Sequence, residues 1–344
     1  MTADVQDDVR LEHVAWDHPD ASALRVAQQA ELRERYGDDD IGHAMTGEQI
    51  VAMVLLRAGG DAVACGALRE APDLGPATGE LKRMYVRPDA RGRGLSRRVL
   101  TALEQVAAGR GLDRLVLETG VLQPEAIGLY LRAGYLPVEN YGEYVGVVDS
   151  RCFAKRLGAG SPAGEGVVGP ATGSLSHAPG GGGQVGVAVE RVAWGHPDAV
   201  ALRRAMVDEL TPLYPEDAFD GPDGFARVDA EQGETAVTTF LLRRDGVPVA
   251  CATHRRAPTG WGDAAELKRL YVAPAARGEG LARRLVRLVE DDAREHGAAC
   301  VVLDTGIRQP EAVGLYLALG YRPVRPPAGA WHSLPVSLWF ARRL

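Results

Sequence analysis

The sequence predicts two α/β (α+β) domains, each a sheet with helices, joined by a flexible tether. Two observations carry this prediction. Most of the chain is an internal repeat of domain size, and each copy interleaves short apolar strand patterns with amphipathic helix patterns. The length of 344 residues agrees with it, because a single domain is usually shorter.

The repeat is clearest in two segments that share an offset of 186 residues. Residues 80–100 and 266–286 are identical at 14 of 21 positions, and residues 117–135 and 303–321 at 13 of 19. Nearer the N-terminus the offset is 178, so the second copy carries a net eight extra residues between its first helix and its hairpin. Copies of this length indicate two homologous domains rather than a solenoid.

The first half of the first copy predicts a helix, a hairpin and a strand. Apolar residues recur at near-helical spacing over residues 20–35, and Pro19 suits a helix start. Two apolar runs, 51–56 and 62–68, flank a Gly-Gly-Asp turn and therefore predict a hairpin. Residues 81–86 have a strand pattern that ends just before a proline.

The second half predicts a helix, a strand, a helix and a closing strand. From Leu95 onward the apolar residues lie on one helical face, and Gly111 suits a C-terminal cap. A short strand at 115–117 precedes a helix at 124–133 that has a proline in its first turn. Residues 152–157 then form the closing strand, and the second copy repeats this order.

Between the copies lies a segment of glycine, alanine, proline and serine that includes four consecutive glycines. Such a composition buries too little apolar surface to offset the chain entropy. We therefore expect domains at 1–157 and 187–344 and a flexible linker at 158–186. A phosphate-binding loop is the alternative, but no strand-to-helix context surrounds the segment.

Composition and charge exclude several classes of protein. The net charge is −7, from 39 basic and 46 acidic residues, which is not the basic footprint of a nucleic-acid binder. No apolar run reaches the roughly 18 residues of a membrane span, and the acidic N-terminal stretch is unlike a secretory signal. The four cysteines have no C-x-x-C spacing, so we expect reduced thiols, no metal site and a cytoplasmic protein.

The sharpest motif is a strand, a glycine-containing loop and a helix over residues 86–96. Such a loop presents backbone N–H groups and the positive end of the helix dipole, which suit a pyrophosphate. Positive charge around the loop comes from four arginines, Arg91, Arg93, Arg97 and Arg98. The alternative is a tight turn without a ligand. Neither a Walker loop nor a dinucleotide fingerprint is present.

This loop resembles motif A of the GNAT N-acetyltransferase superfamily, Gln/Arg-x-x-Gly-x-Gly/Ala, which holds the pyrophosphate of acetyl-CoA. The first copy departs from that pattern only at Ser96, and the second fits it fully although it carries a carboxylate, Glu279, within the loop. The residues that match are Arg91, Gly92, Arg93, Gly94, Leu95 and Ser96, and Arg277, Gly278, Glu279, Gly280, Leu281 and Ala282.

A downstream segment strengthens the resemblance, because the family shows Asn-x-x-Ala-x-x-Leu/Phe-Tyr-x-x-x-Gly-Phe/Tyr. Both copies match it with glutamine in place of asparagine, at Gln123 and Gln309. The resemblance implies a mixed, largely antiparallel sheet flanked by helices and acetyl-CoA as co-substrate. It also implies that one strand of each copy pairs with the pantetheine amides, through Met84, Tyr85 and Val86 and through Leu270, Tyr271 and Val272.

The resemblance also implies catalytic roles. Tyr130 and Tyr316 would be general acids that protonate the departing CoA thiolate, and a phenol is chemically suited to that step. Glu80 and Glu266 lie at the spacing of the general base in some family members. For both glutamates a solvated carboxylate at the end of a strand is the open alternative.

The expected reaction is transfer of an acetyl group to a primary amine of a small molecule or protein, by direct attack on the thioester. Two alternatives stay open: an acyl-CoA-binding module with one or both lobes silent, and an O-acyltransferase. We expect no nucleic-acid or membrane partner, and either a monomer with an internal pseudo-dimer or a homodimer. The polar loop at 140–144 favours the first lobe as the main catalyst.

Acidic residues before each hairpin suggest a cationic or amine-bearing acceptor, although a solvated loop is the favoured explanation of them. These residues are Asp38, Asp39, Asp40, Glu216, Asp217, Asp220 and Asp223.

Overall fold

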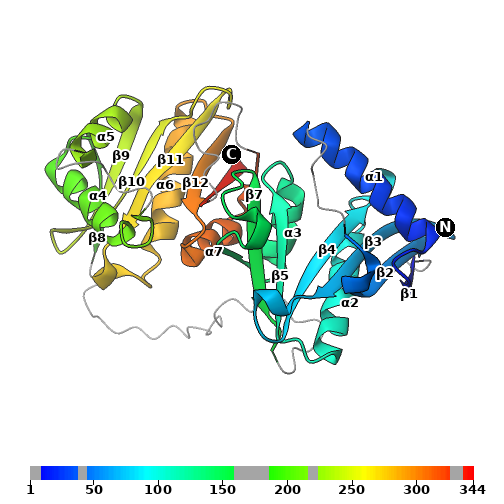
Figure 1. Ribbon diagram of the computed structural model, residues 1–344. Helices are drawn as coiled ribbons and strands as arrows, with labels where there is room; N and C mark the ends of the chain where they lie inside the picture. Colours follow the sequence, from blue (N-terminus) through cyan, green and yellow to red (C-terminus); the bar gives the residue numbers. More distant parts are fainter. Residues whose placement is uncertain (1–8, 38–44, 159–185, 216–223, 326–335) are drawn as a thin grey trace, which may run out of the picture. The chain divides into compact units, whose positions relative to one another are not determined.

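The computed structural model describes residues 9–37, 45–158, 186–215, 224–325 and 336–344, which form two compact units with one seven-stranded sheet each (Figure 1). Nearly all of the expected linker, residues 159–185, lies outside the described residues, as do the acidic residues before the two hairpins. The linker and its boundaries therefore stay a prediction. Each unit is described by itself.

The first sheet has the order β1-β2-β3-β4-β5-β7-β6. All neighbouring strands are antiparallel except β4 and β5, which run parallel, so the sheet is mixed and largely antiparallel as the resemblance implied. Its strands are β1 (Val9–Val14), β2 (Ile50–Ala58), β3 (Asp61–Glu70), β4 (Thr78–Val86), β5 (Arg114–Gly120), β6 (Leu136–Val138) and β7 (Ser150–Arg156).

Two helices, α1 (Pro19–Tyr36) and α2 (Leu95–Gly109), cover opposite faces of this sheet. Neighbouring residues of a strand point to opposite faces of a sheet, so Cys65 and Gly66 of β3 meet different helices. On one face, Leu24 of α1 is buried in the same core cluster as Cys65. On the other face the α2 residue Val99 comes so close to Gly66 that a Cβ there would lie 2.6 Å from it. The third helix, α3 (Pro124–Arg132), follows β5.

The start of α1 shows why its sequence gives a helix at this point. His18 precedes the first turn and its Nδ1 accepts a hydrogen bond from the N–H of Asp20 at 3.3 Å, while Pro19 takes the first helical position. The helix ends at Gly37, whose φ of 71° suits glycine. His196 caps the equivalent helix of the second unit in the same way.

A bulge in β4 opens the sheet beside the parallel pair. Arg83 and Met84 together face Gly66 of β3, and Arg83 has a φ of 54°, which is uncommon for a residue with a Cβ. On its other side β4 pairs with β5 only as far as Glu80 and Val116. Beyond that point the two strands separate, so a gap between strands leads from the middle of the sheet toward the loop after β4.

The second sheet repeats this arrangement in the order β13-β14-β12-β11-β10-β9-β8, with β11 and β12 as its parallel pair. Its strands are β8 (Val187–Val192), β9 (Ala236–Arg244), β10 (Val247–Arg256), β11 (Ala264–Val272), β12 (Cys300–Gly306), β13 (Arg322–Pro323) and β14 (Ser337–Arg343). Its helices are α4 (Pro197–Leu210), α5 (Gly224–Gly233), α6 (Leu281–Glu295) and α7 (Pro310–Ala318).

The predicted helices, hairpins and strands are all present, and the structure adds elements that the pattern did not predict. These are the first strand of each unit, the short strands β6 and β13, and α5, which lies in the segment where the second copy is longer. Within the described ranges, every helix is too short or too polar to cross a bilayer.

Candidate active site

The loop between β4 and α2 has the backbone that its glycines allow. Gly92 and Gly94 have φ of 79° and 74°, and Gly94 directly precedes α2. Gly278 and Gly280 repeat these angles before α6. In the described part of each unit no side chain caps the first turn of these helices, so their N–H groups are available to an anion.

The loop arginines are held against the rest of their unit. Arg91 donates from Nε to the carbonyl of Val86 at 3.0 Å and pairs with Glu31 of α1 at 2.5 Å. Arg277 makes the same two contacts, with Val272 at 3.0 Å and with Glu209 of α4 at 2.7 Å. Each of these guanidinium groups is therefore already hydrogen-bonded to a backbone carbonyl and paired with a glutamate when a phosphate approaches it.

A cleft of about 240 Å³ lies in the first unit between α1, the end of β4, the loop and the start of α3. Five residues predicted from the sequence line it together: Met84, Tyr85, Val86, Arg91 and Gln123. The α1 residues Gln28, Glu31 and Arg35 complete one wall. Gln28 donates to the carbonyl of Met84 at 2.9 Å, so this edge of β4 already attracts an amide.

The other predicted loop residues differ in what they can offer. Gly92, Arg93 and Gly94 are exposed, whereas Leu95 is buried in the packing of α2 and can contribute only its backbone. Ser96 and Ala282 lie in the first turns of α2 and α6. In the second unit Leu270, Tyr271 and Val272 end β11, Gly278 and Leu281 flank the loop turn, and Gln309 precedes α7.

Glu279 of the second loop is bound to Arg244 of β9. The first copy has Arg93 and Ala58 at these two positions. The two units therefore differ at both positions, and in the second unit the positive charge of Arg244 balances the negative charge of Glu279.

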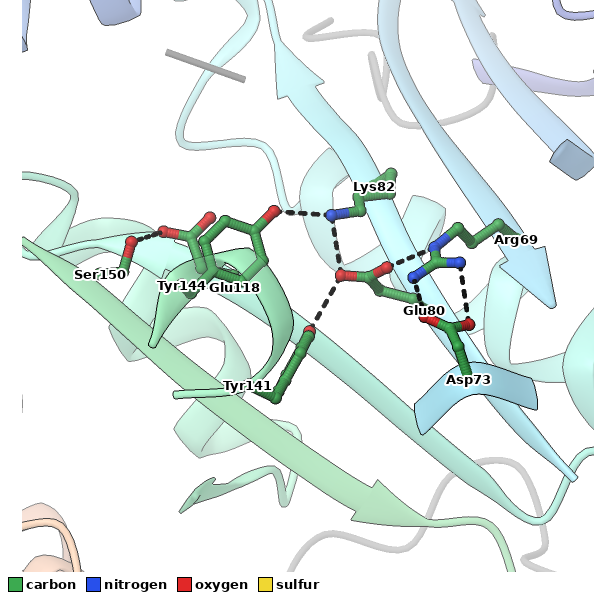
Figure 2. Close-up of polar contacts among 8 residues, drawn as sticks. All are labelled: Arg69, Asp73, Glu80, Lys82, Glu118, Tyr141, Tyr144 and Ser150. Carbon is green, nitrogen blue, oxygen red and sulfur yellow. Dashed lines mark hydrogen bonds and ion pairs between the residues drawn. The ribbon is translucent and has the colours of Figure 1, made fainter. Parts of the chain in front are cut away.

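Glu80 is fully enclosed by polar partners (Figure 2). It is 1% exposed, and its carboxylate binds Arg69 at 2.5 Å, Lys82 at 2.7 Å and the hydroxyl of Tyr141 at 3.0 Å. Glu266 repeats the pattern with Arg255 at 2.5 Å and Lys268 at 3.6 Å. Both oxygens of the Glu80 carboxylate are thus already engaged by protein partners.

Tyr130 lies on the buried side of α3, with its ring centre 5.8 Å from that of Tyr135 and 6.4 Å from that of Phe153. Burial raises the pKa of Tyr130, and the nearby Glu118 carboxylate raises it further, so its hydroxyl stays protonated. Tyr316 has the same surroundings in the second unit, where burial and Asp304 raise its pKa.

Glu118 is a candidate site residue that the sequence analysis did not single out. It follows the last paired residues of β5, in the gap between β4 and β5, and its Oε1 accepts a hydrogen bond from Ser150 at 2.7 Å (Figure 2). Burial raises the pKa of Glu118 above its usual range. The signal was present, because both copies carry a carboxylate in the same apolar strand, as Leu-Glu-Thr-Gly and Leu-Asp-Thr-Gly.

The equivalent carboxylate of the second unit has a different partner. Asp304 pairs with the ammonium group of Lys268. In the first unit the matching Lys82 instead binds Glu80 and the hydroxyl of Tyr144, the latter at 2.7 Å. The described part of the second unit has no tyrosine at that position, since the aligned loop falls outside it.

One group of possible metal ligands lies on β10, on α6 and directly after α6, although none was expected. His254, Asp292 and His296 bring their ligand atoms within 4.8 Å of one another. Asp292 already binds His254 at 2.7 Å and lies 3.4 Å from the guanidinium of Arg191, so a cation already faces the carboxylate.

Comparison with known proteins gives one consistent result. The model of a family described as the acetyltransferase (GNAT) family matches residues 13–135 and 203–321. The IAA acetyltransferase of Azospirillum brasilense is 40% identical over 94 residues, which are 27% of this chain and 60% of that protein. The streptothricin acetyltransferase of Streptomyces lavendulae is 32% identical over 127 residues, 36% of this chain and 64% of that protein.

A solved structure, the ribosomal-protein-S18-alanine N-acetyltransferase of Escherichia coli, is 19% identical with a TM-score of 0.33; the match covers 46% of this chain and 93% of that one. The chain thus spans less than two thirds of the length of the curated relatives named above.

Proposed function

Because this chain belongs to the GNAT acetyltransferase family in both of its repeats, we propose that it transfers an acetyl group from acetyl-CoA to a primary amine and that its first unit is the main catalyst. One similar protein is named for a small-molecule acceptor, streptothricin, and another for the alanine of a ribosomal protein. These names therefore leave open whether the acceptor is a small molecule or a protein.

The cofactor assignment is supported by the cleft and the loop. The backbone N–H groups at the start of α2 suit the pyrophosphate. The end of β4 at Met84–Val86, which does not pair with β5, suits the amides of the pantetheine arm. Gln123 and Arg91 lie at the same cleft. Bound here, acetyl-CoA would supply the acetyl thioester, directed into the gap between β4 and β5.

The catalytic assignment is supported by two buried side chains: Glu118, in the gap between β4 and β5, and Tyr130 of α3, whose pKa is raised by burial and by the Glu118 carboxylate. Glu118, with its raised pKa, takes the proton of the acceptor ammonium, and the free amine attacks the thioester carbon. As the carbon–sulfur bond breaks, Tyr130 donates its proton to the sulfur, and the second proton that the new amide nitrogen loses restores the Tyr130 hydroxyl. We place the base at Glu118 rather than at Glu80, because the Glu80 carboxylate is already held by Arg69, Lys82 and Tyr141.

The single observation that carries the choice of unit is the different partner of the two carboxylates. Glu118 accepts a hydrogen bond from the neutral hydroxyl of Ser150, whereas Asp304 forms an ion pair with Lys268. A carboxylate in an ion pair is a weaker base. The second unit keeps the loop and Tyr316, so it fits an acetyl-CoA-binding module with little turnover.

Release of free CoA in the presence of amine acceptors tests this proposal. Glu118→Gln should lower kcat by about 100-fold or more, because a general base contributes roughly that much. The matched Asp304→Asn should leave CoA release nearly unchanged. Loss of turnover with Asp304→Asn alone would assign catalysis to the second unit.

Tyr130→Phe and Tyr316→Phe form a second matched pair. Loss of turnover only with Tyr316→Phe would contradict the proposal in the same way.

A further inference from the structure

The lysine just beyond the parallel pair of the first sheet has two carboxylates within reach. The last paired residues of β4 and β5 are Glu80 and Val116, and residues two apart on a strand point to the same face. Lys82 and Glu118 each lie two residues further along, so they face the same side of the sheet from neighbouring strands. Lys82 can therefore pair with Glu80 on its own strand or with Glu118, the proposed base.

The equivalent lysine of the second unit pairs with the carboxylate of the neighbouring strand. Glu266 and Val302 are the last paired residues of β11 and β12, which is the same register as in the first sheet. Lys268 forms an ion pair with Asp304, and it lies 3.6 Å from Glu266. This register thus does allow a lysine to reach across to the next strand.

In the first unit the lysine is held on the other carboxylate (Figure 2). Lys82 lies 2.7 Å from Glu80 and donates a hydrogen bond to the hydroxyl of Tyr144 at 2.7 Å. Glu118 instead accepts from Ser150 at 2.7 Å, and within the described part of this unit it makes no ion pair with Lys82. The difference between the units therefore coincides with a tyrosine hydroxyl on the lysine.

The loop before β7 holds this tyrosine in place. The amide of Asn140 donates to the carbonyls of Val147 at 3.2 Å and Ser150 at 3.1 Å, which closes the loop that carries Tyr144. The sequence of the second copy contains no tyrosine after Tyr321. A hydroxyl of this kind is therefore available to the lysine of the first unit and absent from the corresponding sequence of the second.

The position of Lys82 affects how readily Glu118 takes a proton, because a cation beside a carboxylate favours its charged form. Burial raises the pKa of Glu118, and the charge of Lys82 opposes this effect. The other groups whose charges interact with Glu118 are acids, so Lys82 is the cation of the set. These acids are Glu80, Glu143, Tyr36, Tyr130, Tyr144 and Cys152.

We propose that Tyr144 is a positioning residue, whose hydroxyl holds Lys82 on Glu80 and away from Glu118 and so keeps Glu118 available as the base. The inference rests on the proposed N-acetyltransferase function and adds to it a residue that separates the active unit from the silent one. In the second unit the lysine is paired with Asp304 instead.

Tyr144→Phe tests the proposal in the full-length protein, because it removes the hydroxyl and keeps the half-buried ring. Lys82 should then pair with Glu118, as Lys268 pairs with Asp304. We expect the acid limb of kcat/KM for CoA release to move about 1–3 pH units lower, the effect of a cation beside a carboxylate. Turnover at neutral pH should also fall, since the base is weaker.

Lys82→Met should move the acid limb in the opposite direction, to higher pH, because the cation that favours the charged carboxylate is lost. The double variant of Tyr144→Phe and Lys82→Met should behave like Lys82→Met alone, a dependence that a general defect in folding would not produce. Lys268→Met is the matched control from the second unit and should leave the acid limb in place.

Calorimetry should show the same acetyl-CoA binding for every variant. An acid limb that does not move in Tyr144→Phe, or a downward shift that persists in the double variant, would overturn the positioning role alone. An unmoved limb in Lys82→Met would overturn it as well, by a route that does not depend on the tyrosine variant. No CoA release by the unmodified protein with any amine would overturn the proposed function and the positioning role with it.

Discussion

At the scale of single residues, Glu80 stabilises its unit by pairing with two largely buried cations, Arg69 and Lys82. Glu80→Gln removes the negative charge between Arg69 and Lys82 (Figure 2). We expect a loss of about 3 kcal/mol in the free energy of unfolding, as for other buried ion pairs that lose one partner. Urea denaturation measures this value.

Asp73→Asn is the control for that variant. Asp73 binds the same Arg69 at 3.2 Å, but its side chain is 58% exposed, so a loss below about 0.5 kcal/mol is expected. If Glu80→Gln instead kept its stability and lost turnover with a changed pH profile, Glu80 and not Glu118 would be the base.

The pH dependence of turnover should report Glu118. A general base acts only when deprotonated, and burial raises the pKa of Glu118 above the usual value of a glutamate. We therefore expect kcat/KM to fall as the pH drops through this raised pKa, with activity fully present above it. In Glu118→Gln the acid limb should disappear from the residual activity, and an unchanged limb would exclude this carboxylate.

Residues whose role depends on the backbone were predictable from the sequence, and residues whose role depends on partners were not. The spacing of Gly92 and Gly94 alone predicts a loop, and both residues have a positive φ in the structure. In the sequence, Glu118 and Glu80 are both carboxylates within strands. Only the fold shows that Glu118 accepts a hydrogen bond from Ser150, whereas Glu80 pairs with two cations. Their different chemistry comes from neighbours that are distant in sequence.

At the scale of elements, Tyr36 and Arg35 tie the end of α1 to Leu122, just after β5. The hydroxyl of Tyr36 accepts from the N–H of Leu122 at 3.0 Å and lies where a Cβ on Gly120 would be, at 1.8 Å. Burial raises the pKa of Tyr36 to about 12, so this hydroxyl stays neutral. Because α1 forms one wall of the cleft, this contact positions the cleft as well.

Gly120→Ala should therefore displace Tyr36 and loosen α1. We expect a loss of about 1–3 kcal/mol in stability, as for other overpacked sites, together with weaker acetyl-CoA binding. Gly314→Ala is the control, since it lies inside α7 with open space at its Cβ and should stabilise by about 0.5–1 kcal/mol. Unfolding curves and calorimetry test both; a neutral Gly120→Ala would show that α1 can shift freely.

The elements that the sequence did not predict share a physical reason. The strands β6 and β13 have three and two residues, too few for a periodic pattern. In the sequence, the helix α5 was apparent only as a net insertion of eight residues, because many of its contacts are polar. Asp229 binds Arg203 of α4, and Gln232 accepts a hydrogen bond from Arg269 of β11. A helix that buries ion pairs lacks the apolar stripe by which helices are recognised.

At the scale of the whole molecule, each half of the chain supplies all the strands of its own sheet. Within the described residues, strands β1–β7 belong to the first sheet and β8–β14 to the second, and none is exchanged between them. Each unit also has its own cluster of buried residues between its first helix and its sheet. Each unit therefore has what a domain needs to fold by itself.

The linker prediction can be tested on this basis. Residues 159–185 are rich in glycine and contain little that could pack, so a protease should cut there first and leave two stable fragments of similar mass. Because both units keep the loop before α2 or α6, each separated fragment should bind one acetyl-CoA in calorimetry.

The cut also separates the two proposed roles of the units. If the first unit carries the chemistry, CoA release should persist after cleavage and copurify with the N-terminal fragment, since Glu118 and Tyr130 receive all their described contacts from that unit. The intact protein with Tyr130→Phe, cut in the same way, is the matched control and should be silent in both fragments. Loss of turnover on cleavage of the unmodified protein would mean that the second unit contributes to the active site of the first, and the single-unit mechanism would then be wrong.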